Sequence, residues 1–480
     1  MYKRLGFMFA ERHCINSHVW RRRGIPLLAC VALVLLFRQP SSAYLRLHPE
    51  NPHYFLETKT GKAVLLVGHG GPAPTSKAID YIAQIKKDAS QGMMYGRVWS
   101  LLPWEYGNAI WPWVRSSTPG AGDGLGNKYD LNTWNSEYWS RMRDCLAKTN
   151  KAGIYSEVFL FEGCGMEDAE RRWHNNPWAS DNNINSLETM NCHSSGTPDF
   201  YNYSSKPNLR GQQERYVSKL IDETISFPNV IYEIENEHDS GNEPAWTIYW
   251  SQFIRNRISA KYPSSPRLIS QTSDFEVCFS APTIDIVNYH SDSADLRRYN
   301  NFLEGNWRRN KAMNVDELAN GETNYDALRK VCWTIVASGG HFHIEDARPS
   351  AKPYAIARNI LLFNSKSKWD FVHAAPNKKL IASGEGYCVA NPGLEYMCYF
   401  PSGGEKTVSI PAGTYISRWW NTRDGGLSAG VTFSHAGGNK TFVTPSPGDW
   451  ALHILESSGR KVRPRVSSSP SQTDGSSRRP

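Results

Sequence analysis

The chain has 480 residues, of which 40% are hydrophobic and 12% aromatic, and its formal net charge is +8. This length and apolar content are enough for one large buried core, or a large and a small one, and they exclude wholesale disorder and a multi-span membrane protein. The charge is uneven: residues 1–43 carry +6, residues 457–480 carry +5, and residues 44–456 carry −3. Because the central part has no basic excess, we expect no nucleic-acid partner.

The N-terminal segment has the pattern of a secretion signal. Arg21, Arg22 and Arg23 precede an apolar run over residues 25–37, and small residues at 41–43 suit cleavage after Ala43. The run is shorter than the roughly 20 residues that a membrane-spanning helix needs. We therefore expect a secreted chain, with an uncleaved membrane anchor over 1–43 as the alternative. The Ser/Pro/Arg-rich tail over 457–480 is predicted to be disordered.

From residue 63 onward, short apolar runs alternate eight times with longer amphipathic ones. The expected strands are 63–68, 93–99, 154–161, 229–235, 267–271, 284–289, 311–316 and 341–345. The expected helices are 77–90, 135–151, 211–226, 245–261, 294–308, 325–337 and 353–366, while the link between the fifth and sixth strands is irregular. Such alternation predicts a parallel sheet, and eight units predict an α/β fold of the (β/α)8 TIM-barrel type over residues 44–375.

Residues 376–456 follow a different pattern, with short strand-like runs separated by Gly, Pro, Asn and Asp turns. This pattern predicts a small antiparallel β-sandwich. Cys388 and Cys398 lie on two neighbouring runs, 387–390 and 396–400, where a disulfide could bridge them, and the sequence leaves the pairing of the cysteines open. Asn202 and Asn439 begin Asn-x-Ser/Thr motifs for glycosylation.

Two carboxylates are placed to work together at the barrel mouth. Strand 229–235 runs on into Asn236 and Glu237, and period-two alternation puts Glu233, Glu235 and Glu237 on one face, with the first two deeper in the barrel. The seventh strand leads to Glu317, 80 residues beyond Glu237. Active sites of such barrels form at the carboxyl ends of the strands, and paired carboxylates can cleave glycosidic bonds. Asp316 and Glu345 are alternatives to Glu317.

The loops after the second and third strands, over 100–133 and 162–209, are long enough to build a site. They and the preceding strand end are rich in aromatic residues, which stack on the apolar faces of sugars. The candidates for this aromatic wall are Trp99, Trp104, Tyr106, Trp111, Trp113, Trp173 and Trp178.

The Asn236-Glu237 pair resembles the Asn-Glu signature of the clan A retaining glycoside hydrolases, which are (β/α)8 barrels. The run over 51–68 resembles the start of the apiosidase-like members of that clan, and 418–426 and 444–452 resemble motifs of their C-terminal domain, which is named collagen-binding. One departure follows the first strand, where the group carries Asp-Thr and an aromatic residue and this chain has His69, Gly70 and Gly71.

The resemblance implies Glu237 as acid/base and Glu317 as nucleophile. It further implies that Asn236, Arg97, Tyr289 and His290 bind sugar or hold the carboxylate pair. Trp104 and His341 are added as candidate substrate contacts. The expected function is therefore that of a secreted retaining glycoside hydrolase with a carbohydrate substrate, acting as a monomer without metal or cofactor.

Three alternatives stay open at this point. One is a non-catalytic carbohydrate-binding or cell-wall protein on the same barrel. Another is an inverting arrangement of the two carboxylates. The third is a metal-dependent hydrolase that uses His341 and His343, for which a further matched set of ligands is needed.

Overall fold

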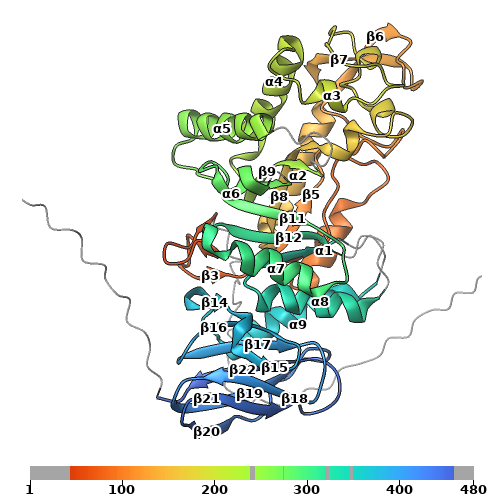
Figure 1. Cartoon of the computed structure of the whole chain (residues 1–480). Coiled ribbons are helices and arrows are strands. Elements are labelled where there is room, and N and C mark those ends of the chain that lie inside the picture. Colours follow the sequence, from red (N-terminus) through yellow and green to blue (C-terminus); the bar gives the residue numbers. More distant parts are fainter. Residues whose placement is uncertain (1–43, 238–243, 274, 319–323, 346–349, 459–480) are drawn as a thin grey trace, which may run out of the picture. The chain divides into compact units, whose positions relative to one another are not determined.

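The computed structural model describes residues 44–237, 244–273, 275–318, 324–345 and 350–458 (Figure 1). The predicted signal segment over 1–43 and most of the predicted basic tail lie outside these residues. Within the described ranges, no helix combines the length and hydropathy needed to span a bilayer.

Eight parallel strands form one nearly closed sheet in the order β4-β13-β12-β11-β10-β9-β8-β5. Figure 1 labels β5, β8, β9, β11 and β12 of this sheet. Between β4 and β5 the contact continues through the Arg97 N–H, which donates to the Gly70 carbonyl at 3.4 Å. The predicted (β/α)8 barrel is thereby confirmed. The strands are β4 (Val67–His69), β5 (Tyr95–Val98), β8 (Tyr155–Glu162), β9 (Val230–Asn236), β10 (Ile269–Thr272), β11 (Ile286–His290), β12 (Ala312–Leu318) and β13 (His341–Ile344).

Helices follow the strands along the chain and bury their apolar faces in the large core. Several begin at a side-chain cap: Asp80, Asn135, Asp295 and Asn324 each accept a backbone N–H of the first turn. The irregular link after the fifth strand contains a short helix that the sequence pattern did not predict, α6. The helices are α1 (Tyr81–Ser90), α2 (Ser136–Ala152), α4 (Pro207–Thr224), α5 (Pro244–Lys261), α6 (Phe275–Ser280), α7 (Leu296–Asn306), α8 (Tyr325–Ala337) and α9 (Lys352–Ser367).

The glycines after the first barrel strand allow β4 and β5 to approach each other. A Cβ on Gly68 would lie 2.5 Å from the Tyr95 carbonyl oxygen, and one on Gly71 would overlap the Arg97 carbonyl oxygen. Gly70 has a φ of +71°, which favours glycine. The His-Gly-Gly sequence therefore has a backbone role in bringing Arg97 to its place.

The predicted strand 63–68 is two separate strands. β3 (Ala63–Val64) joins β1 (Leu45–Leu47) and β2 (Phe55–Glu57) in a small antiparallel sheet, and only β4 enters the barrel. Leu45, Phe55 and Leu66 pack with residues at the amino ends of the barrel strands, such as Tyr155 and Ile231. The N-terminal sheet therefore covers the end of the barrel opposite the expected site.

The two long loops fold against each other. The first contains an antiparallel hairpin, β6 (Trp113–Pro119) and β7 (Asn127–Trp134), which the sequence pattern did not predict. The second contains η1 (Gly163–Met166), η2 (Trp173–Asn175), η3 (Ser180–Asn182) and α3 (Thr197–Phe200). The Ile184 N–H donates to the Tyr129 carbonyl at 2.9 Å.

Most of the loop tryptophans are core residues, which corrects the prediction of an extended aromatic wall. Trp111, Trp113, Trp173 and Trp178 are at most 3% exposed and belong to the large hydrophobic core. Their burial holds the two loops together, so they are not free to stack on a ligand.

The C-terminal strands form two antiparallel sheets around a separate core that includes Tyr396, Phe400 and Ile454. The predicted β-sandwich is confirmed. One sheet has the order β14 (Ala375–Pro376), β16 (Tyr387–Asn391), β17 (Glu395–Phe400), β22 (Trp450–Glu456), β19 (Gly413–Asn421) and β20 (Val431–His435), and the other has β15 (Ile381–Ser383), β18 (Glu405–Ile410) and β21 (Gly438–Val443).

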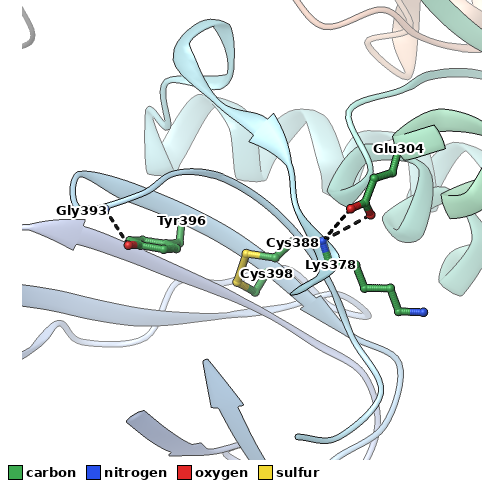
Figure 2. The surroundings of a disulfide bond; sticks show 6 residues. All are labelled: Glu304, Lys378, Cys388, Gly393, Tyr396 and Cys398. Atoms are coloured by element: carbon green, nitrogen blue, oxygen red, sulfur yellow. Dashed lines mark hydrogen bonds between the residues drawn. A yellow bond between two sulfur atoms is a disulfide. The ribbon is translucent and has the colours of Figure 1, made fainter. Parts of the chain in front are cut away.

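Figure 2 shows the disulfide between Cys388 and Cys398, which face each other directly on β16 and β17, a pairing that the sequence pattern allowed. Figure 2 also shows the Glu304 carboxylate of α7, which accepts the Lys378 backbone N–H at 3.1 Å. The disulfide fastens a hairpin of the β-sandwich, and Glu304 connects its first turn, η6 (Lys378–Leu380), to a barrel helix.

A buried ion pair also joins the barrel to the β-sandwich. Asp449, 1% exposed, accepts from Arg329 of α8 at 2.7 Å, from the Thr422 hydroxyl at 2.6 Å and from the Tyr399 hydroxyl at 3.2 Å. Burial would raise the pKa of Asp449, but Arg329 and Thr422 outweigh it and hold the pKa below its usual value. The Asp449 carboxylate is thus ionised and joins the β-sandwich to helix α8 of the barrel through Arg329.

Replacing Asp449 by Ala should lower the free energy of unfolding by about 2–4 kcal/mol, because Arg329 and two hydroxyls lose their acceptor. The matched control is Asp326→Ala, which removes the exposed carboxylate on the same arginine and should cost less than about 1 kcal/mol. Chemical denaturation measures both. Equal costs for the two variants would contradict the assigned role of Asp449.

Candidate active site

A fully buried arginine on β5 organises the carboxyl end of the barrel. Arg97 donates through Nη1 to Glu317 Oε1 at 2.5 Å, and through Nη2 to Glu233 Oε2 at 2.8 Å and to Asn236 Oδ1 at 2.5 Å. Burial would lower the pKa of Arg97, but the surrounding carboxylates hold it well above its usual value. Three more carboxylates lie 3.6–3.7 Å from the guanidinium: Glu157, Asp316 and Glu345.

The two carboxylates predicted to act together do lie together. Carboxylate oxygens of Glu237 and Glu317 lie within 4.8 Å of each other and of a His290 ring nitrogen. Both glutamates have left-handed backbone conformations, with φ of +50° at Glu237 and +54° at Glu317. Such conformations are strained for residues other than glycine, and they cluster at functional sites.

Irregular strand geometry turns consecutive polar residues toward Arg97. The β12–β13 register shifts between Val315 and Leu318, so Asp316 and Glu317 both reach the guanidinium. On β9, Glu233 and Asn236 contact Arg97, whereas Glu235 accepts a hydrogen bond from Tyr201 of the second loop. Strict period-two alternation, which predicted Glu233, Glu235 and Glu237 on one face, therefore does not hold at the end of β9.

His290 bridges the carboxylates at the end of β11. Its Nε2 lies 3.4 Å from Glu237 Oε1 and 3.2 Å from Glu317 Oε2, and its Nδ1 lies 3.5 Å from Asp316 Oδ1. Burial would lower the pKa of His290, but these carboxylates raise it to about 12. The imidazole is therefore a second cation beside Arg97.

A glutamate that the sequence reasoning missed lies beside Glu237. Glu162 ends β8, is 1% exposed, and accepts from Asn236 Nδ2 at 3.1 Å and from the Cys164 thiol at 3.0 Å. Burial, and then the charge of Glu237, hold the pKa of Glu162 well above its usual value. A Cβ on Gly163 would overlap the Glu237 carbonyl oxygen, so this glycine lets the ends of β8 and β9 meet.

The site's other carboxyl groups differ in their tendency to hold a proton. Burial raises the pKa of Glu317, with Arg97 and His290 opposing it. The pKa of Glu345 lies well above its usual value through burial and the charge of Glu317. Arg97 lies at 2.5 Å from Glu317 but at 3.7 Å from Glu345. The anion is therefore favoured on Glu317 and the proton on Glu345.

Two predicted substrate contacts lie elsewhere. Tyr289 is on the other side of β11 from His290: its ring stacks on Phe302 at 4.1 Å and its hydroxyl accepts from Arg298. His341 is fully buried at the amino end of β13, where Nδ1 accepts the Leu66 N–H at 3.0 Å. Both are structural residues in this arrangement. Among the described residues, the groups with metal-binding geometry contain neither His341 nor His343.

Trp104, another predicted contact, is 37% exposed at the rim of a hollow of about 450 Å³. Its ring meets Trp99 edge to face at 5.0 Å. The wall of the hollow is connected to the segment beside the carboxylate cluster, because Arg172 donates to the Cys164 carbonyl at 3.3 Å. Its lining consists of Trp104, Tyr106, Asp168, Glu170, Arg171, Arg172 and His174.

Comparison with known proteins identifies the fold. A family model described as "Domain of unknown function (DUF6298)" matches residues 94–275, which include Arg97, Glu162, Asn236 and Glu237. No curated protein sequence matches the chain.

Solved structures that share the fold are titled as glycoside hydrolases. One, titled "Glycoside hydrolase", superposes with a TM-score of 0.58 at 16% identity, covering 87% of this chain and 97% of its own. Another, a family 5 glycoside hydrolase from Bacteroides vulgatus ATCC 8482, gives a TM-score of 0.60 at 14% identity and covers 88% and 95%. The shared fold includes the barrel and extends over most of the chain. The narrower resemblance to apiosidase-like hydrolases stays a prediction.

His290 should remain an imidazolium across about pH 5–8, where free histidine titrates. In protein with labelled histidine, its ring signal should keep the chemical shift of the charged form, and His290→Gln identifies that signal. His341, whose pKa burial lowers to about 4, should keep the neutral shift as the internal control. A His290 signal that titrates near 6.5 would contradict the assignment.

The raised pKa has a consequence for stability. Stabilisation from the His290 proton is fully present below the unfolded pKa of about 6.5 and is lost as the pH rises toward the folded value.

Proposed function

We propose that this protein is a secreted retaining glycoside hydrolase that cleaves O-glycosidic bonds of an oligo- or polysaccharide. The observation that carries the proposal is the Glu237–Glu317 pair, with oxygens within 4.8 Å at the mouth of the barrel. Retaining enzymes hold their two carboxyl groups about 5–5.5 Å apart, whereas inverting enzymes need a wider gap for water. The glycoside hydrolase titles of structures with the same fold support the reaction class.

Glu317 is the nucleophile in this proposal. Its carboxylate is held by Arg97 at 2.5 Å and by His290 at 3.2 Å. Burial raises the pKa of Glu317, and the two cations oppose that shift, favour the anionic form of the attacking oxygen and fix its direction. Glu317 attacks the anomeric carbon, the bond to the leaving oxygen breaks, and a covalent glycosyl-enzyme forms.

Glu237 is the acid/base, and it works as one half of a pair with Glu162. The pKa of Glu237 is lowered, because His290 and Cys164 outweigh its burial, which alone would leave no proton to donate. The pKa of Glu162, whose carboxylate lies within 4.8 Å of that of Glu237, is raised well above its usual value. Two such groups titrate as a unit and share one proton.

That shared proton passes from Glu237 to the leaving-group oxygen in the first step. In the second step the carboxylate takes a proton from the attacking water, and the pair returns to its starting state. Asn236 connects the components, since it donates to Glu162 and accepts from Arg97.

Glu237→Gln and Glu317→Gln should each lower kcat/KM by at least about a thousandfold on a glycoside found by screening aryl glycosides and polysaccharides. Glu170→Gln, which changes a carboxylate in the wall of the hollow, is the control and should retain activity. The roles separate in Glu317→Ala and Glu237→Ala with added azide. In Glu317→Ala, azide should replace the missing nucleophile and give a glycosyl azide of inverted configuration. In Glu237→Ala, azide should attack the glycosyl-enzyme and give a glycosyl azide of retained configuration. Near-wild-type rates in both Gln variants would favour a binding protein instead.

Glu162→Gln should shift the basic limb of the kcat/KM profile to lower pH by about one unit or more. Without the second carboxyl, Glu237 loses its proton at its own lowered pKa, so the acid form disappears earlier as the pH rises. The Glu170→Gln control should leave the limb in place. If Glu162→Gln lowered kcat/KM equally at every pH and left the basic limb in place, Glu162 would have only a packing role.

A further inference from the structure

The second long loop contains a group of potential metal ligands apart from the carboxylate cluster. One ligand atom each from His174, Cys192 and His193 lie within 4.8 Å of one another. His174 lies on η2, while Cys192 and His193 lie in the segment between η3 and α3. Cys192 is fully buried and has no disulfide partner among the described residues.

A fourth donor adjoins this group. Asp181 Oδ2 lies 3.3 Å from Cys192 Sγ, and its other oxygen accepts the Cys192 backbone N–H at 2.7 Å. Ligands at about 2.0–2.3 Å from a tetrahedral zinc ion lie roughly 3.3–3.8 Å apart. The thiol and the carboxylate already have this spacing. The imidazole nitrogens lie within 4.8 Å of the thiol and must come closer to it, and Asp181 lies outside the set of atoms that are all within 4.8 Å of one another.

The backbone around the ligands is held in place before any ion binds. The Asn182 amide donates to the His174 carbonyl at 2.8 Å, and its oxygen accepts the Asp123 N–H at 2.8 Å. Gly122 packs so closely that a Cβ there would overlap Asp181 Oδ2 and lie 2.6 Å from Cys192 Sγ. The donors are thus fixed where the β6–β7 turn meets the second loop.

The ring nitrogens of the two histidines are free to bind. Within the described part of the chain, no hydrogen bond to the ring of His174 or His193 is found, and the rings lie 5.0 Å apart. Two imidazoles, a thiolate and a carboxylate form a donor set that suits Zn²⁺ better than the hard cations Ca²⁺ and Mg²⁺.

We propose that His174, Cys192 and His193, with Asp181 as the fourth donor, form a structural zinc site that fastens the second long loop to the β6–β7 turn. Binding displaces the thiol proton of Cys192 to solvent, and the thiolate then bonds the ion. The site adjoins the hollow, because His174 belongs to its lining and its ring stacks on Tyr106 with centroids 6.1 Å apart. Zinc therefore fixes one wall of the hollow.

The test uses the full chain after removal of metals with a chelator, and it needs no activity. Titration with ZnCl₂, followed by mass-spectrometric metal analysis, should give one equivalent bound. At a hundredfold excess over Kd, the melting temperature should rise by about 3 °C. Co²⁺ in place of Zn²⁺ should show a thiolate-to-metal charge-transfer band, because Cys192 is a ligand.

Two variants and a control decide the location. Cys192→Ser should abolish the charge-transfer band, and His193→Ala should weaken zinc binding more than tenfold. Because His193 is exposed, metal-free His193→Ala should have the same melting temperature as the metal-free wild type. This variant therefore keeps the test valid if Cys192→Ser fails to fold. His435→Ala, at a histidine of the β-sandwich, should bind like the wild type.

Three results would overturn the proposal: no stoichiometric zinc, cobalt binding without a thiolate band, or full affinity in His193→Ala. The last would place the ion at one of the two other groups with similar spacing, Glu237 with His290 and Glu317 or Glu162 with Cys164 and Glu237.

Discussion

The arrangement of the site depends on one buried positive charge. Arg97 has no exposed surface. Carboxylates from β8, β9 and β12, and that of Glu345 after β13, all lie within 3.7 Å of its guanidinium. A buried arginine needs such partners, and the same partners need the arginine, since isolated buried charges are costly. The number of acids exceeds what one cation can neutralise. The raised pKa values of Glu157, Glu162 and Glu345 favour protons on these acids, and His290 adds a second cation, so the excess of negative charge is reduced.

Backbone irregularity concentrates these groups. A regular strand presents every second residue to the barrel interior, which would place only one of Asp316 and Glu317 there. The register shift on β12 and the left-handed conformation of Glu317 bring both inward. Glu237 reaches the mouth by a similar conformation, beside a glycine that leaves room for its carbonyl group. The strain is offset by the many hydrogen bonds and ion pairs that these positions allow.

The sequence was sufficient for the barrel, the β-sandwich and the Glu237–Glu317 pair, because these follow from periodicity and from strand-end chemistry. Glu162 carries the same signal, an acid at the end of a strand, but this signal alone does not distinguish it from other strand-end acids. Tyr289 and His290 are both predicted at the site, but neighbouring residues of a strand face opposite sides, so only His290 reaches the carboxylates. The loop tryptophans could not be assigned from composition, since stacking on sugar and packing in a core require the same side chain.

The loops and the carboxylates depend on each other through a short chain of contacts. Arg172, in the wall of the hollow, donates to the Cys164 carbonyl, and the Cys164 thiol donates to Glu162, which accepts from Asn236. A shift of the second loop would therefore change the environment of the Glu162–Glu237 proton as well as the shape of the hollow. In the proposed mechanism a catalytic proton needs a pKa near the working pH, so the position of that loop affects the acid/base pair as well as the shape of the hollow. Burial of Trp173 and Trp178 in the core holds the loop in place.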